Sequence, residues 1–159
     1  MELYFLRHGA AASRVGWTDD DALRPLTDRG REEVGRMATL LARTAPALDA
    51  VLTSPYIRAA QTADIVAEHL SLQDKVTSDA SITPGFDEAR LTKVVGRFAG
   101  AKALLVVGHE PDFSTIIGRL TGARIVLKKG GMALVETPGR SLHRATLVWL
   151  VQPGLVGGA

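Results

Sequence analysis

The sequence predicts a single three-layer α/β/α domain over residues 1–152, with a mostly parallel sheet and an antiparallel hairpin at one edge. Short apolar runs alternate along the chain with stretches of helical period, which is the pattern of repeated strand–helix units. The apolar run 103–107 is continuous, as is typical of strands buried on both faces of a parallel sheet. Two late apolar runs, 132–136 and 145–151, flank a Pro-Gly turn, and this spacing favours a hairpin.

The first third of the chain contains a strand, a long loop and a helix. A strand is expected at residues 3–6, where an apolar run ends at Arg7-His8-Gly9. Residues 10–26 lack a sustained period and are therefore expected to form a loop. Thr27 stands where an N-cap belongs, ahead of an amphipathic helix of about five turns. The apolar face of that helix carries Val34, Met37, Ala38 and Leu41.

The middle of the chain continues the alternation of strands and helices. A second strand at 50–53 stops at Ser54-Pro55, and an alanine-rich helix follows over residues 56–70. A weak strand at 76–78 leads through a Thr-Pro-Gly turn to a third helix at 87–98. Apolar side chains recur in that helix at i, i+3, i+4 and i+7, as a helix with one buried face requires.

The last third begins with the buried strand 103–107, which Gly108 ends. Asp112 is expected to cap a fourth helix that ends near Gly122. The late hairpin follows. The Gly-rich residues 153–159 are expected to form a flexible tail outside the domain.

The composition is that of an ordinary globular protein, with 46% hydrophobic and 23% charged residues among 159. The chain has no cysteine, which excludes disulfides, thiolate metal sites and a cysteine nucleophile. A net charge of +2 without a basic stripe does not predict nucleic-acid binding, although polyanion binding stays open as an alternative. No run is long enough to cross a bilayer, and the N-terminal apolar run is too short for a signal peptide. A cytoplasmic location without membrane attachment is therefore expected.

Three polar clusters directly follow predicted strands. They are Arg7-His8-Gly9, the segment Ser54 to Arg58, and Gly108-His109-Glu110. Ligands of open α/β sheets bind outside the carboxyl ends of the strands, so these clusters are expected to meet at one edge. The fold would then bring together two histidines and two arginines that lie up to about 100 residues apart.

Two histidines with two arginines, and no cluster of metal-binding carboxylates, favour a phosphoryl group as the ligand. Guanidinium groups match phosphate oxygens with paired hydrogen bonds and do not lose their charge. A neutral imidazole can attack phosphorus and form a covalent phosphoenzyme, and neighbouring guanidinium groups disfavour the imidazolium form. A second histidine could donate a hydrogen bond to the phosphoryl oxygens, and a helix N-terminus after Pro55 would add its positive end.

These segments resemble the motifs of the histidine phosphatase superfamily, the phosphoglycerate-mutase-like proteins. The run Phe5 to Gly9 is similar to the Arg-His-Gly signature, Ser54 to Ala63 to the second block, and Val107 to Pro111 to the block with the second histidine. They occur in the family's order, and the likeness covers nearly the whole chain. The short length, the run Leu23 to Gly30 and the run Ile82 to Gly85 most resemble the SixA-type phosphohistidine phosphatases.

The resemblance implies a phosphoglycerate-mutase-like fold and an activity that needs neither a metal nor a cofactor. It implies that His8 is phosphorylated during turnover. Arg7, Arg58 and His109 would hold the phosphoryl group, with Gly9 beside them.

The general acid is the point at which the sequence departs from relatives that cleave phosphomonoesters. Mutase-like members carry the acid in an insert between the second and third blocks, where this chain has little room. The acid-phosphatase branch places an aspartate just after its second histidine, a position that Glu110 occupies here. Asp87 and Glu88, at the start of the third predicted helix, are the other candidates.

A missing acid has a physical interpretation. An alkoxide leaving group needs a positioned acid, whereas solvent can protonate the imidazole released from phosphohistidine near neutral pH. The hypothesis is therefore a phosphatase acting on a phosphorylated protein, either a histidine-phosphotransfer domain or a histidine kinase. Two alternatives remain open. One is a small-molecule phosphatase that uses Glu110 or Glu88 as its acid, and the other is a non-catalytic module that binds phosphate or a phosphoprotein.

Overall fold

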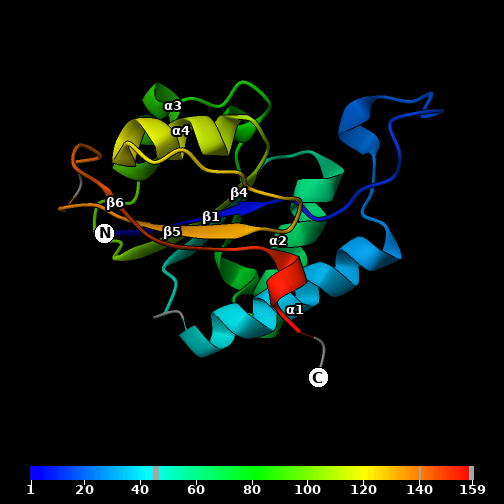
Figure 1. The fold of residues 1–159 in the computed structure, drawn as a ribbon, viewed down its shortest axis with the longest axis horizontal. Coiled ribbons are helices and arrows are strands. Elements are labelled where there is room, and N and C mark those ends of the chain that lie inside the picture. Colours follow the sequence, from blue (N-terminus) through cyan, green and yellow to red (C-terminus); the bar gives the residue numbers. More distant parts are fainter. Residues whose placement is uncertain (45–46, 140, 158–159) are drawn as a thin grey trace.

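The computed structural model describes residues 1–44, 47–139 and 141–157. Within these residues a six-stranded sheet has the order β3-β2-β4-β1-β5-β6 (Figure 1). Strands β3, β2, β4 and β1 are parallel, whereas β5 is antiparallel to both β1 and β6. The predicted sheet with its antiparallel edge hairpin is therefore confirmed. The strands are β1 (Glu2–Arg7), β2 (Ala50–Thr53), β3 (Val76–Ser78), β4 (Ala103–Gly108), β5 (Met132–Glu136) and β6 (Thr146–Val151).

Helices cover both faces of the sheet, which confirms the three layers (Figure 1). Helices α1 (Asp28–Thr44) and α2 (Ile57–Leu70) pack on one face, and α3 (Glu88–Gly96) and α4 (Asp112–Thr121) on the other. None of the helices in the described parts of the chain is long and apolar enough to span a membrane. Short 3-10 helices occupy Asp21–Leu23, Gln73–Lys75, Ala80–Ile82 and Pro153–Leu155.

The two faces of the sheet have separate hydrophobic cores, and successive residues of β1 contribute to them alternately. Leu3 and Phe5 belong to the core under α3 and α4, whereas Tyr4 and Leu6 belong to the core under α1 and α2. All four side chains are at most 1% exposed. Because strand side chains alternate between faces, a strand covered on both sides must be apolar throughout. This requirement explains the unbroken apolar runs of β1 and β4.

The start of α1 is capped as predicted, but the start of α4 is not. The side chain of Thr27 accepts a hydrogen bond from the Gly30 N–H at 3.0 Å, as an N-cap residue does. Asp112 lies inside the first turn of α4, and its carboxylate accepts from the N–H groups of Gly85 and Phe86 at 2.8 and 3.1 Å. Asp112 therefore holds the turn before α3 and does not cap α4.

The end of the described chain differs from the flexible tail expected over residues 153–159. Pro153–Leu155 form a 3-10 helix, Pro153 is buried, and Val156 packs against the core under α1 and α2. The side chain of Gln152 anchors this turn, because it accepts from Lys128 N and donates to Val126 O at 2.9 and 2.6 Å. Residues 158–159 lie outside the described residues.

Candidate active site

The carboxyl ends of β1, β4 and β2 lie side by side in the middle of the sheet. Arg7, the last residue of β1, pairs in register with Gly108, the last residue of β4. The backbone hydrogen bonds continue past the strand ends, because His8 N donates to Gly108 O and Ser54 N donates to Val107 O, both at 3.0 Å. The three motif segments therefore emerge from one edge of the sheet, as predicted.

A cavity of about 470 Å³ opens at this edge. Its lining brings together five of the predicted site residues, namely Arg7, His8, Arg58, His109 and Glu110. The long loop before α1 forms much of the remaining wall through residues that include Arg14, Asp21 and Arg24. The motif residues are thus gathered in one polar cavity, and the loop contributes charged groups of its own.

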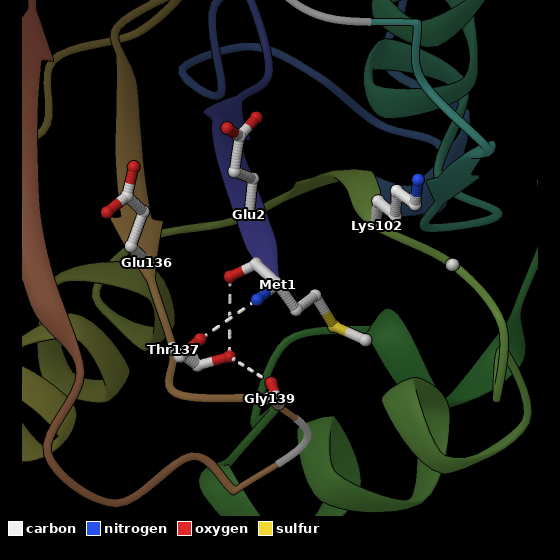
Figure 2. Close-up of a pocket in the computed structure, with 7 residues that line it drawn as sticks. Met1, Glu2, Lys102, Glu136, Thr137 and Gly139 are labelled. Atoms are coloured by element: carbon white, nitrogen blue, oxygen red, sulfur yellow. Dashed lines mark hydrogen bonds between the residues drawn. The ribbon is translucent and has the colours of Figure 1, made fainter.

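A second pocket, of about 370 Å³, lies at the opposite edge, around the amino ends of β1 and β4 (Figure 2). Its lining includes Met1, Glu2 and Lys102, and the Met1 amino group donates to Thr137 O at 2.9 Å. No motif residue lines this pocket, so its lining does not contribute to the site.

His8 is held with its lone pair on Nε2. Its Nδ1 lies 2.8 Å from Gly9 O, and its Nε2 lies 3.2 Å from Nε of Arg58. Because an arginine nitrogen can only donate, Nε2 must accept, and the ring proton resides on Nδ1. Burial, assisted by the positive charges of Arg58 and Arg7, lowers the pKa of His8 to about 3. His8 is therefore a neutral imidazole at neutral pH, with a nucleophilic Nε2.

Arg58 is only 4% exposed and is held by the loop before α1. Its Nη1 donates to the backbone oxygen of Asp21 at 2.7 Å, and its Nη2 donates to the Asp21 carboxylate at 3.0 Å. The guanidinium also lies over the ring of Tyr56, 4.9 Å from its centroid. Asp21 in turn accepts a hydrogen bond from Arg24 at 2.7 Å. This chain of contacts fixes the plane of the Arg58 guanidinium beside His8.

His109 and Arg7 carry buried nitrogen atoms without hydrogen-bond partners in the described part of the chain. These atoms are Nδ1 of His109 and Nε of Arg7. The other ring nitrogen of His109 lies 2.8 Å from Ser54 Oγ, and Nη1 of Arg7 donates to Leu127 O at 2.9 Å. Burial lowers the pKa of His109 to about 4, with the charge of Arg58 acting in the same direction. Two unpaired nitrogen atoms beside the guanidinium group of Arg58 suit an anionic ligand with several oxygens.

The candidate acids lie in different places. Glu110 lines the cavity, and its two carboxylate oxygens accept hydrogen bonds from the Ser114 N–H and hydroxyl at 3.0 and 2.6 Å. Asp87 is the N-cap of α3 and accepts from Arg90 N at 2.9 Å, and Glu88 follows it in the first turn. Asp87 and Glu88 line a separate hollow with Arg119 and do not reach the cavity. Acidic residues favour helix N-termini, which accounts for both.

Gly9 was predicted to lie beside the phosphoryl group, but its polar groups are engaged elsewhere. Its N–H donates to Thr62 Oγ1 at 3.1 Å, and its carbonyl contacts His8 Nδ1. Gly9 is not part of the cavity lining. Its contribution is therefore to orient His8 and to connect the turn after β1 to α2.

Sequence patterns alone assigned no role to several residues around the site. Asp21 and Arg24 come from the loop, Ser54 follows β2, and Thr62 lies on α2. A run of three aspartates at 19–21 precedes Arg24 in the sequence, but nothing in it indicates which one faces Arg58. No group of three or more histidine or carboxylate side chains that could hold a metal ion occurs among the residues that the structure describes.

The fold and the site define a histidine phosphatase. The family model described as "Histidine phosphatase superfamily (branch 1)" matches residues 3–105, and the chain belongs to this superfamily. Within it the chain is of the SixA type. It is 30% identical over 122 residues to phosphohistidine phosphatase SixA of Escherichia coli (strain K12), which is 76% of this chain and 74% of that protein.

Further similarities cover more of the chain. An uncharacterized protein of Picosynechococcus sp. is 34% identical over 139 residues, which is 83% of this chain and 82% of that protein. A solved structure of the protein histidine phosphatase SixA complexed with tungstate has a TM-score of 0.86 and 27% identity. It covers 97% of this chain and 98% of that chain. Together these findings confirm the predicted fold class and support a phosphatase activity.

Proposed function

We propose that the protein hydrolyses phosphohistidine on a protein substrate, through a covalent phosphohistidine intermediate at His8 and without a metal. The observation that carries the proposal is the state of the two carboxylates in the described cavity lining. Glu110 is engaged by Ser114 through both oxygens. Partial burial raises the pKa of Asp21, but hydrogen bonds and charge from Arg24 and Arg58 outweigh this and lower it overall. Neither carboxylate is set up as a proton donor.

In the first step, Nε2 of His8 attacks phosphorus while the P–N bond of the substrate breaks. The electron pair of that bond stays on the leaving imidazole nitrogen, which takes its proton from water. For attack to occur, Arg58 shifts its Nε hydrogen bond from His8 to a phosphoryl oxygen, which frees the lone pair. Nδ1 of His8 keeps its proton and continues to donate it to Gly9 O, and this accepting carbonyl stabilises the positive charge that the ring acquires.

In the second step, a water molecule attacks phosphorus and the bond to His8 breaks. The electron pair returns to Nε2, and the water proton leaves to solvent with the release of inorganic phosphate. Arg7, Arg58 and His109 hold the phosphoryl oxygens in both steps. The two guanidinium groups stay charged throughout, and the neutral His109 ring keeps one N–H donor.

The leaving group decides which phosphorylated compound suits this site. An alkoxide is strongly basic, and a positioned acid contributes about 10²–10⁴-fold to its departure. An imidazole has a reference pKa of about 6.5 and can be protonated by solvent at neutral pH. A cavity whose carboxylates are both engaged therefore favours P–N over P–O cleavage.

Access to the cavity supports a protein substrate. The described chain between α2 and β4 forms β3, α3 and short 3-10 helices, and Pro84 is its single contribution to the cavity lining. At the rim, Arg14 has 81% of its side chain exposed. With no insert from this stretch over the opening, a bulky phosphorylated domain can approach His8.

Turnover of a phosphorylated histidine-phosphotransfer domain and of p-nitrophenyl phosphate tests the proposal. We expect the first substrate to be dephosphorylated far faster, and His8→Ala to lower that rate by at least about 10³-fold. Mass spectrometry of the quenched reaction should place the phosphate on His8. His143→Ala is the matched control, because His143 is exposed and distant in sequence from the motifs, and it should leave the rate unchanged.

Two outcomes would contradict the proposal. Faster turnover of the ester would identify a small-molecule phosphatase instead. Binding without turnover, unaffected by His8→Ala, would identify a non-catalytic phosphate-binding module.

A further inference from the structure

The two ring nitrogens of His109 lie in contrasting surroundings. Nε2 is 2.8 Å from the hydroxyl of Ser54, whereas Nδ1 is buried without a partner among the described residues. Burial lowers the pKa of His109 to about 4, so at neutral pH the ring carries a single proton. A neutral imidazole donates from one nitrogen and accepts at the other. The contribution of His109 to catalysis therefore depends on which nitrogen carries that proton.

The surroundings of Ser54 determine where the proton lies. Ser54 is 0% exposed, and its Oγ accepts a hydrogen bond from the Tyr56 N–H at 3.3 Å. If Nε2 of His109 carried the proton, Oγ would face two donors, and the hydroxyl proton would be buried with no acceptor among the described residues. If the hydroxyl donates to Nε2, the hydroxyl and Nε2 are both paired, and Nδ1 of this cavity-lining residue is left to donate to a ligand. The opposite tautomer leaves both the hydroxyl proton and Nδ1 unpaired, so the first arrangement is favoured.

We propose that Ser54 is a positioning residue that keeps the proton of His109 on Nδ1, where it donates to a phosphoryl oxygen. The inference deepens the proposed function and rests on it, because it assigns a role to Ser54 in the same reaction. Ser54 acts through His109 and does not itself touch the substrate. The arrangement parallels other sites in which a hydrogen-bonding partner selects the tautomer of a catalytic histidine.

The fold holds Ser54 firmly enough for this role. Its N–H donates to Val107 O of β4 at 3.0 Å, so the end of β2 is fixed to the strand that leads into His109. The ring of Tyr56 packs edge-on against His109, with 5.0 Å between the ring centroids. The first contact holds Ser54 in place, and the second restrains the imidazole with Nε2 beside Ser54.

Nitrogen-15 NMR of the imidazole groups tests the tautomer directly and needs no enzymatic activity. In the wild-type protein at pH 7 we expect the proton of His109 on Nδ1. In Ser54→Ala we expect a population of the Nε2-protonated form to appear. A wild-type spectrum with the proton on Nε2 would overturn the proposal, whether or not the protein hydrolyses phosphohistidine.

Kinetics test the consequence for the reaction. Ser54→Ala should lower kcat on the phosphorylated domain by about 10- to 100-fold, the range typical of a residue that orients a functional histidine, with little change in KM. Ser54→Thr retains a hydroxyl and should recover part of the loss. Ser78→Ala, at the exposed end of β3, is the matched serine control and should be neutral.

A double-mutant cycle separates positioning from general damage to the fold. In a His109→Ala background, Ser54→Ala should cause no further loss of kcat, because its effect passes through the imidazole. An equal loss in both backgrounds would overturn the positioning role. Failure of the proposed function would be recognised separately, as absence of turnover in the wild-type protein while the NMR result still stands.

Discussion

Arg58 has five N–H donors, and contacts with the described residues use three of them. One goes to Nε2 of His8, and two go to the backbone oxygen and carboxylate of Asp21. The remaining two are available to phosphoryl oxygens. The Asp21 contacts fix the guanidinium plane, so these two donors have a defined direction before a ligand arrives. Preorganisation of this kind reduces the side-chain conformational entropy that is lost when a ligand binds.

Replacing Asp21 therefore tests whether the loop orients Arg58. We expect Asp21→Asn to lower kcat/KM by about 10-fold, because it removes the charge-assisted part of the contact and leaves the backbone contact in place. Asp19→Asn is the matched control, since Asp19 is an exposed carboxylate of the same loop. Steady-state kinetics of both variants on the phosphorylated domain provide the measurement. Equal effects would show that only the loop's net charge matters.

The sequence predicted the residues that follow strands and missed those that contact them from elsewhere. Arg7, His8, Arg58 and His109 could be placed together because parallel strands end at one edge. Asp21 could not be distinguished from the two aspartates before it, because the loop has no period that relates side-chain direction to sequence position. Ser54 belonged to a predicted cluster, but its hydroxyl was given no role, because a serine after a strand is an ordinary turn residue.

At the scale of elements, the turn after β1 lies directly against the first turn of α1. A Cβ built on Gly9 would lie 2.7 Å from Val34 Cγ2 and 3.0 Å from the backbone oxygen of Gly30. A Cβ on Gly30 would lie 2.1 Å from the carbonyl oxygen of Ala10. Only glycines permit so close an approach of two backbones. The position of His8 thus depends on α1 as well as on β1.

Gly9→Ala should destabilise the protein by about 1–3 kcal/mol, because Val34 and the backbone of α1 must move to accommodate the methyl group. Gly35→Ala, which lies within α1, is the control with the opposite expected sign. Its Cβ would meet the ring of His69 at 3.8 Å, an ordinary contact, so the variant should gain about 0.5–1 kcal/mol from helix propensity. Urea denaturation compares the two, and a Gly9→Ala variant as stable as the wild type would contradict the tight contact.

Helix boundaries were easier to predict than their caps. Glycine and proline mark the strand ends, and the apolar period marks the helices, so the order of elements followed from local signals. Asp112 resembled a cap by type and position, yet its carboxylate accepts hydrogen bonds from Gly85 and Phe86, which lie 27 and 26 residues earlier. A hydrogen bond to a segment distant in sequence leaves no pattern in the residues around Asp112. The 3-10 helix at Pro153 escaped prediction for the same reason, since its partners lie on distant elements.

At the scale of the whole molecule, two buried neutral histidines make stability depend on pH. The pKa of His8 is lowered to about 3 and that of His109 to about 4, against about 6.5 in an unfolded chain. At a pH between the folded-state and unfolded-state pKa values, the unfolded state binds more protons than the folded state, so stability decreases as pH falls below about 6.5. Across that range, each histidine lowers the free energy of unfolding by up to about 1.4 kcal/mol for each unit by which the pH falls.

Urea midpoints measured between pH 7 and pH 4.5 test this expectation. We expect the wild-type midpoint to fall over this range, and His109→Asn to have a shallower pH dependence because one of the two titrations is removed. His143→Ala should retain the wild-type dependence, since that side chain is exposed. Identical slopes in all three proteins would show that the buried imidazoles are not the source.

The order of the sheet strands has a consequence for how activity is acquired during folding. The groups around the cavity come from the ends of β2, β4 and β1, which lie side by side in that order in the sheet. About fifty residues of chain separate β2 from β4, and about a hundred separate β1 from β4. Contacts between such distant segments require closure of long loops, whereas α1 and α2 depend on local contacts. Phosphatase activity should therefore return only in the last phase of refolding, after helical signal is recovered. The return of activity therefore reports that the strands have finished pairing.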